Sequence, residues 1–410
     1  MDMLMHERIS ANALEILSDS GIVYSLKFRE VLRAASNYPD IFGLADSIPS
    51  PKHEIADVQW RDYMMIPHAG RKICFGELFN SLSLRKTGPD IVVFWLENLC
   101  HEFTAGNETR AAKFAGCLSH LIGDTGQAAH LMDERLLQDI FPQKNACYLT
   151  HRTLEAITAE IPHEKYVPRI LGFSPHELEW RLLEELVILN RREKKELPIL
   201  FAAIENKDLT KQRKSAAKTA RHCAELFADV LFTVRSILNG SISVSEDSVV
   251  ALHSLNPVEM FCDSYFNYSI MIDRISGKDI YSPMSLDLGN GPESGIAMLV
   301  RLTPGITDER EAYAEYSLPP GIFASFSAKV GLCRNIHNQG GAIFQIYTDG
   351  KCIFETPALT ADSAPFTISC SIQNAKNLRL RVIDARGKNQ KTALFFYPIW
   401  INPVLKRVEI

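Results

Sequence analysis

The histidines are unevenly distributed, and the densest group indicates a metal site. Ten of the 12 lie at or before His222. In the segment LSHLIGDTGQAAHLMD, His120 and Asp124 are four residues apart, so both would project from one face of a helix. An imidazole and a carboxylate one turn apart can bind the same ion. His130 follows beyond Gly126 at a spacing that is not helical, so either the chain kinks there or His130 serves a second ion.

A second pair repeats this spacing. His151 and Glu155, in THRTLEAI, are also four residues apart on an expected helix. Nitrogen and oxygen ligands suit a borderline or hard divalent ion; zinc fits this mixture best, and manganese or iron is chemically tolerable. Each pair alone is more often a surface pair or a capped core histidine. Here two such pairs occur in one short region, with His130 between them. We therefore give equal weight to a metal site and to a role as surface pairs or capped core histidines.

Helices would have to position these residues. The periodicity of HERISANALEIL, with apolar residues on one face, predicts a helix near the N-terminus. Similar patterns occur at residues 108–124 and 151–160. Residues 175–238 are typical of long amphipathic helices interrupted near Asn206–Lys207–Asp208, and the Asn239–Gly240 pair is a stop signal.

After Gly240 the pattern changes to alternating β-branched and aromatic segments. The expected strands are 265–272, 322–330, 342–356, 366–372 and 378–384. The Asp349–Gly350 pair predicts a hairpin turn. We therefore expect a multidomain α plus β fold, an all-helical metal-binding domain followed by a β-sandwich. The expected boundaries are 1–240 for the helical domain, 241–279 for a linker and the start of the β region, and 280–410 for the sandwich.

The metal-binding segment resembles a known family. HLIGDTGQAAH followed by His–x3–Glu is similar to the signature of the zinc-dependent phospholipases C, which share an all-helical fold with the single-strand-specific zinc nucleases. A longer gap between His130 and His151 than in the bacterial phospholipases implies an inserted loop, 131–150. HERISANAL offers His6 for the histidine of the family's first helix. That helix also resembles the one that begins the glycosylphosphatidylinositol-specific phospholipase D group.

The family pattern also requires an aspartate, often after proline, and a later histidine. Asp40, in Tyr38–Pro39–Asp40, and His53 answer this description. Alternatives are Asp46 and Asp57 for the carboxylate, and His68 for the imidazole.

The resemblance implies two or three zinc ions. The first would be held by His53, His120, Asp40 and Asp124, the second by His130, His151 and Glu155, with Asp40 as a bridge, and the third by His6 and Asp124. In the secreted bacterial enzymes the N-terminal amine completes the third site, so two ions are the safer expectation. Asp40 is the candidate catalytic residue that orients or deprotonates the attacking water.

The implied activity is hydrolysis of a phosphodiester in a phospholipid or glycolipid head group. Paired metal ions, about 3.5–4 Å apart, would bind the phosphate oxygens and supply a hydroxide ion at neutral pH. A single-strand nuclease on the same scaffold is an alternative, and a non-catalytic, metal-containing glycan-binding protein is another. The net charge of -5 argues against a general nucleic-acid binder.

The C-terminal segments resemble the NPCBM domain, a sandwich proposed to bind carbohydrate. The phrases are YSLPPGIFASFSAKVGL, IFQIYTDGKCIFET and ISCSIQNAKNLRLRVIDARG, with Trp400, across about 280–405. A glycan partner is implied, and a purely structural sandwich is the alternative. The family's polar step before its tryptophan is replaced here by Phe396–Tyr397–Pro398–Ile399. Tyr347 and Trp400 are candidate sugar-stacking platforms, although burial is the commoner role for such aromatic residues.

Two features bear on location. No apolar stretch is long enough for a transmembrane helix. The N-terminal segment is patterned as an amphipathic helix rather than a signal peptide, which favours a protein inside the cell or one whose leader has been removed. The nine cysteines are widely spaced and form no CxxC pair, so we expect a reducing compartment.

Overall fold

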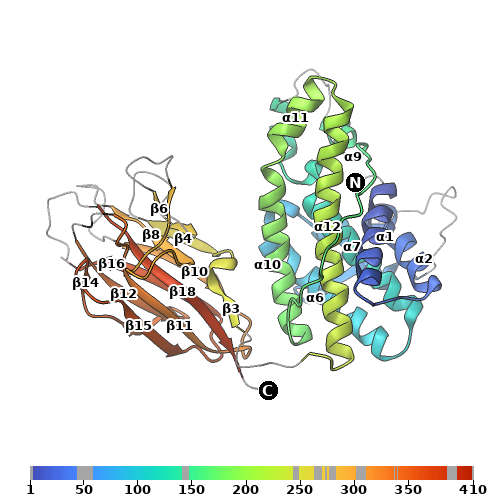
Figure 1. Cartoon of the computed structure of the whole chain (residues 1–410). Coiled ribbons are helices and arrows are strands. Elements are labelled where there is room, and N and C mark those ends of the chain that lie inside the picture. The colour runs from blue at the N-terminus through green and yellow to red at the C-terminus, as the bar shows by residue number, and fades with distance from the viewer. Residues whose placement is uncertain are drawn as a thin grey trace. The chain divides into compact units, whose positions relative to one another are not determined.

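The computed structural model contains two compact units, Met1–Ser243 and Val244–Ile410 (Figure 1). The first is helical and the second is built from strands, so the expected fold class is confirmed. The structure describes residues 3–43, 59–140, 147–242, 249–262, 270–272, 275–276, 283–301, 311–336, 338, 340–385 and 395–408.

The first unit contains long helices joined by short ones. Among its described residues these are α1 (Met3–Asp19), α2 (Leu26–Ala35), α3 (Tyr38–Phe42), α4 (Arg61–Met64), α5 (Phe75–Leu78), η1 (Ser81–Ser83), α6 (Leu84–Thr104), α7 (Glu108–Gly126), η2 (Ala128–His130), α8 (Glu134–Ile140), α9 (Cys147–Glu155), α10 (Pro175–Lys194), α11 (Leu197–Glu205) and α12 (Leu209–Leu238). The predicted interruption at 206–208 separates α11 from α12, and the predicted stop at 239–240 follows α12. In the described part of the chain, no helix is long and apolar enough to cross a membrane.

One hairpin departs from the all-helical expectation for this unit. Strands β1 (Met65–His68) and β2 (Arg71–Cys74) pair antiparallel. Ala69 and Gly70 both have positive φ, 47° and 78°, as a two-residue type I′ turn requires. The alanine, which seldom adopts this conformation, gave no turn signal, so the hairpin was not predicted.

Helix α7 is the centre of the helical unit. It packs against α1, α2, α6, α10 and α12, and every residue from Phe114 to Gly126 is buried. A helix surrounded on all sides is usually apolar. Its C-terminal half nevertheless carries His120 and Asp124, 1% and 4% exposed, so these two polar residues lie in the interior.

The second unit contains two six-stranded sheets. One has the order β13-β12-β16-β10-β4 with β14 beside β12, and the other has the order β15-β11-β18-β8-β5 with β3 beside β18. The strands are β3 (Val249–Ala251), β4 (Glu259–Cys262), β5 (Ile270–Ile272), β8 (Gly295–Met298), β10 (Glu311–Ser317), β11 (Phe323–Leu332), β12 (Gly341–Thr348), β13 (Lys351–Glu355), β14 (Leu359–Thr360), β15 (Phe366–Ser371), β16 (Asn377–Asp384) and β18 (Pro398–Arg407). Short additional elements are η3 (Leu252–Ser254), β6 (Ile275–Ser276), β7 (Pro283–Met284), β9 (Val300–Arg301) and β17 (Phe395–Phe396). Strands β3 to β5 lie in the segment 241–279, so both sheets include strands that precede residue 280.

The core of this unit lies between the two sheets. Buried and half-buried residues alternate strictly along β16, the period expected of a strand with one face inward. Trp400 of β18 is 0% exposed and meets Phe344 of β12 edge-on, with ring centroids 5.2 Å apart. Burial in the core, the commoner role, is therefore confirmed for Trp400, which cannot stack on a sugar. The hairpin at Asp349–Gly350, between β12 and β13, is also confirmed.

Candidate metal centre

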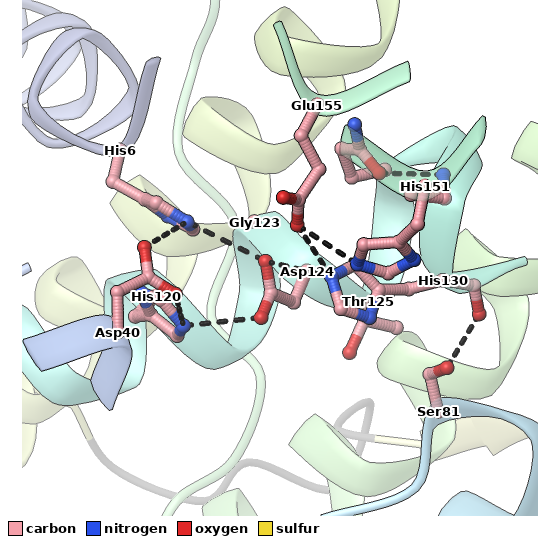
Figure 2. A network of polar contacts seen from close by, with 12 residues as sticks. His6, Asp40, Ser81, His120, Gly123, Asp124, Thr125, His130, His151 and Glu155 are labelled. Atoms are coloured by element: carbon pink, nitrogen blue, oxygen red, sulfur yellow. Dashed lines mark hydrogen bonds and ion pairs between the residues drawn. The ribbon is translucent and has the colours of Figure 1, made fainter. Parts of the chain in front are cut away.

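The expected metal ligands within the described residues converge at one place in the helical unit (Figure 2). They are His6 from α1, Asp40 from α3, His120 and Asp124 from α7, His130 from η2, and His151 and Glu155 from α9. His53, with its competitors Asp46 and Asp57, lies outside the described residues. His68, the other alternative, contacts Asp90 instead, with 2.5 Å between Nδ1 and Oδ2.

The first cluster consists of His6, Asp40 and His120. The carboxylate of Asp40 faces both imidazoles, with Oδ2 3.8 Å from His6 Nε2 and Oδ1 3.7 Å from His120 Nε2. The two rings are stacked with centroids 3.9 Å apart. Both Nε2 atoms therefore approach the same carboxylate from one side.

The second cluster consists of His130, His151 and Glu155. Glu155 Oε1 lies 3.4 Å from His130 Nε2 and 3.1 Å from His151 Nε2. The chain turns sharply between α7 and this cluster, because α7 ends at Gly126 and the short helix η2 carries His130. This is the kink that was one of the two alternatives for the non-helical spacing of His130.

Asp124 joins the two clusters. Its Oδ1 lies 3.4 Å from His6 Nε2 and 3.5 Å from His130 Nε2, and its Oδ2 lies 3.0 Å from His120 Nε2. The resemblance implied Asp40 as a bridge between the first and second ions. In the structure the carboxylate that lies between the clusters is that of Asp124 (Figure 2).

Neighbouring polar groups orient these ligands. His120 Nδ1 lies 2.8 Å from the carbonyl oxygen of Ser36, and because a carbonyl can only accept, Nδ1 carries a proton and Nε2 is the ring atom that faces Asp124. A hydrogen bond that fixes the far ring nitrogen is typical of metal-binding histidines. Ser10 and Ser119 form a buried hydrogen bond of 2.8 Å between their hydroxyls, which holds α1, and with it His6, against α7.

Unsatisfied nitrogen atoms supply a test of whether the site suits a metal. Among the described residues, His6 Nδ1 and Nε2 and His130 Nε2 are buried without a hydrogen-bond partner. Leaving such an atom without a partner costs about 1–3 kcal/mol. A cation would satisfy the Nε2 lone pairs and offset the charge of the three nearby carboxylates, so the residues present fit a site for divalent cations.

Burial and neighbouring charge shift the ionisation of the site. Burial, reinforced by His120, lowers the pKa of His6 to about 3. Desolvation raises the pKa of Asp40. Burial opposes ionisation of Asp124 too, but the imidazoles of His130 and His120 outweigh it and hold the pKa of Asp124 well below its usual range. In the same way, the nearby imidazoles of His130 and His151 outweigh burial and depress the pKa of Glu155.

A pocket of about 520 Å³ opens beside the clusters. Asp40, His120, Asp124, His130 and His151 form one part of its wall. The rest includes the aromatic rings of Phe75 and Phe79 and the polar residues Asn80, Ser81, Asp133 and Arg135. The pocket therefore places candidate ligands, apolar surface and one cation around a space large enough for a small head group.

Several lining residues were not anticipated from the sequence. Asn80 and Ser81 lie at a short 3₁₀ helix and carry no spacing signal. Ser81 Oγ donates to the backbone carbonyl of His130 (Figure 2). Arg135 belongs to the segment 131–150, which the resemblance marks as an inserted loop. A cation in a loop that follows a metal-binding motif is the signal that could have identified it.

The chain contains an NPCBM/NEW2 domain. The family model of that description matches residues 301–405, which confirms the resemblance seen in the C-terminal segments. No curated protein matches the chain significantly.

Likenesses to solved structures are distant. The CBM51-2 and INT domains of Clostridium perfringens ZmpB are 18% identical, with 39% of this chain and 31% of that structure covered and a TM-score of 0.28. The CBM51 of Clostridium perfringens GH95, in complex with methyl-galactose, is 16% identical, with 39% and 100% covered and a TM-score of 0.27. The alpha-toxin from an avian strain of Clostridium perfringens is 10% identical, with 98% and 96% covered and a TM-score of 0.34. The chain spans under a third of the ZmpB structure. At these values none of the three assigns a function.

Proposed function

We propose that the helical unit is a zinc-dependent phosphodiester hydrolase that acts like a phospholipase C on a phospholipid or glycolipid head group. The observation that carries the proposal is the convergence of four imidazoles and three carboxylates beside one pocket, whose wall includes three of the imidazoles and two of the carboxylates. Nitrogen and oxygen donors in this ratio suit zinc. Two divalent cations held there would neutralise the phosphodiester, lower the pKa of a water and stabilise the leaving oxygen.

Side chains that line the pocket would assist the reaction. Asp40 is the most solvent-accessible of the three carboxylates, with 34% of its side chain exposed, and it lines the pocket. A carboxylate at this position can orient an attacking water or accept its proton. Arg135 can donate to a phosphate oxygen, and the rings of Phe75 and Phe79 keep water from the side of the pocket they line.

The NPCBM/NEW2 domain would guide this activity. We propose that it binds a glycan and brings the hydrolase to glycolipids or glycan-coated surfaces. A nuclease on the same helical scaffold is the second candidate, because two-metal sites also cleave the phosphodiesters of nucleic acids. The net charge of -5 makes long nucleic acids the less favoured substrates.

Elemental analysis and a substrate comparison test the proposal. The full-length protein should contain at least two zinc ions per chain and should hydrolyse bis-p-nitrophenyl phosphate. Phosphatidylcholine, a glycosylphosphatidylinositol and single-stranded DNA assayed side by side should separate a lipase from a nuclease. His120→Ala and His130→Ala should lose metal and activity together, whereas His101→Ala, an exposed histidine of α6, should keep both. Full activity in metal-free protein would exclude the mechanism, and metal without any hydrolysis would indicate a binding protein.

A further inference from the structure

A second, positively charged pocket adjoins the candidate metal centre. It has a volume of about 390 Å³ and is lined by Arg85 and Lys86 at the start of α6 and by Arg191 and Lys194 at the end of α10. We call it the basic pocket. Ser81 and Leu82 line both this pocket and the pocket of the metal centre, so the two spaces are neighbours.

Two of the four cations that line the basic pocket are not paired with a carboxylate in the described part of the chain. Arg85 is paired with Glu184, with 2.7 Å and 3.2 Å between the guanidinium nitrogens and the carboxylate oxygens. Among the described residues, Lys86 and Lys194 have no ion pair. Burial and then the charge of Arg191 lower the pKa of Lys194, because each disfavours the charged ammonium group.

Helix stability does not account for all of these cations. Arg191 and Lys194 lie in the last turn of α10, where the helix dipole favours positive charge. Arg85 and Lys86, however, lie in the first turn of α6, which contains no acidic residue and where the dipole disfavours cations. The ion pair with Glu184 accounts for Arg85, which leaves Lys86 without a carboxylate partner among the described residues at this helix end, and a bound anion would supply one.

Hydrogen bonds connect the residues between the two pockets to the backbone at the metal ligands. Asn190 is 5% exposed, and its amide nitrogen lies 3.5 Å from the carbonyl oxygen of Ser81 and 3.3 Å from that of Thr125. Thr125 directly follows Asp124, and Ser81 donates to the backbone of His130 (Figure 2). A group bound in the basic pocket would thus be held in a fixed relation to the metal centre.

We propose that the basic pocket binds a second phosphate group of the substrate, a phosphate carried on the same lipid head group as the phosphodiester that is cleaved. This inference rests on the proposed function, since it assumes that the cleaved phosphodiester lies at the metal centre. Lysine ammonium and arginine guanidinium groups donate charge-assisted hydrogen bonds to phosphate oxygens. The pocket would then select head groups that carry an extra phosphate over those that do not.

The surroundings favour a lipid over a nucleic acid. Leu82, which lines both pockets, is 45% exposed. Helix α8, whose Arg135 lines the metal pocket, exposes Leu136 and Ile140 by 47% and 40%. Apolar side chains beside cations suit an anionic membrane surface. The four cations line a single pocket rather than a track along several phosphates, as binding to a nucleic-acid strand would require.

The test compares matched substrates and variants of the full-length, zinc-loaded protein. Vesicles of phosphatidylcholine would contain either phosphatidylinositol 4-phosphate or phosphatidylinositol, and bis-p-nitrophenyl phosphate would serve as a reference without a second phosphate. The double variant Lys86→Gln/Lys194→Gln should lower the ratio of kcat/KM for phosphatidylinositol 4-phosphate to that for the reference by about 100-fold, mainly through KM. Lys195→Gln, an exposed lysine next to Lys194 that does not line the pocket, should leave the ratio unchanged.

Each outcome decides the matter. An unchanged ratio in the double variant, or equal rates on the two lipids in the native protein, would overturn the inference even if hydrolysis itself is observed. A preference for a 5′-phosphorylated thymidine dinucleotide over phosphatidylinositol 4-phosphate would replace the lipid with a nucleic acid. If no substrate is hydrolysed, the proposed function fails, and calorimetry with inositol 1,4-bisphosphate still tests the pocket. Binding that the double variant loses would support the pocket, and no binding would overturn it.

Discussion

Gly123 lies directly beneath the imidazole of His6. A Cβ atom added at Gly123 would stand 3.0 Å from His6 Nδ1 and 3.1 Å from Cε1. The imidazole therefore packs on the bare backbone of α7, and this close approach lets Nε2 of His6 reach Asp124. A residue that is not a ligand thus determines whether α1 can contribute one.

We expect Gly123→Ala to weaken metal binding although no ligand is removed. The methyl group must displace the His6 ring, and changes next to a metal ligand typically cost about 10- to 100-fold in affinity. Competition with a chromogenic chelator would measure the change. Gly88→Ala is the matched control, because its Cβ would meet the flexible end of Leu183 and alanine favours a helix. Equal metal affinity in the two variants would show that the packing of His6 does not matter.

Replacement of Asp124 should remove the zinc ions bound at both clusters. It approaches His6, His120 and His130, so Asp124→Asn removes a shared negative charge. We expect this variant to lose nearly all bound zinc. His151→Ala should lose only the ion of the second cluster, and His6→Ala only that of the first. Elemental analysis of the three variants gives the stoichiometries; retention of one full ion in Asp124→Asn would contradict a shared role.

The sequence predicted the parts of this site that depend on local geometry. His120 and Asp124 share a helical face because of their spacing, and His151 and Glu155 do so for the same reason. The approach of His6 and Asp40 to that helix depends on how α1 and α3 pack on α7, which no spacing reveals. Only the family resemblance brought these two residues into the expected set.

Tertiary packing also decided the features that spacing left open. The position of Asp124 between the clusters depends on the turn at Gly126, which brings His130 back toward α7. Asn80 and Ser81 reach the pocket from the short helix η1, which is distant in sequence from α7. In the sandwich, the alternating pattern predicted strands but could not decide whether Trp400 faces a ligand or the opposite sheet.

Glu193 should make the helical unit sensitive to acid. Its carboxylate is 1% exposed and accepts from Thr219 Oγ1 and His222 Nδ1, each at 2.7 Å. Burial opposes ionisation, but these hydrogen bonds outweigh it and lower the pKa of Glu193 from its ordinary 4.5. A carboxyl with a depressed folded-state pKa contributes stability above pH 4.5, and this contribution is lost as the pH falls through the folded-state pKa.

Glu193→Gln should therefore destabilise the protein at neutral pH but not in strong acid. We expect a cost of about 1–3 kcal/mol at pH 7 in the free energy of unfolding. The difference from the native protein should shrink as the pH falls below 4.5 and through the lowered folded-state pKa, because the native carboxyl then becomes protonated as well. Urea unfolding at a series of pH values measures both. A constant difference at all pH values would show that the charge of Glu193 is not what stabilises the fold.

Trp400 should stabilise the sandwich without contributing to glycan binding. It is fully buried between the sheets and contacts Phe344 and Phe326, so Trp400→Ala should cost about 3–5 kcal/mol. Its Nε1 has no hydrogen-bond partner among the described residues, so Trp400→Phe should cost much less, because it also removes a donor that burial leaves unsatisfied. Phe261→Ala, at a site 37% exposed, is the control and should cost little. Hydrogen exchange of β11 and β18 in the full-length protein would report the changes. Loss of glycan binding in a stably folded Trp400→Phe variant would contradict a purely structural role.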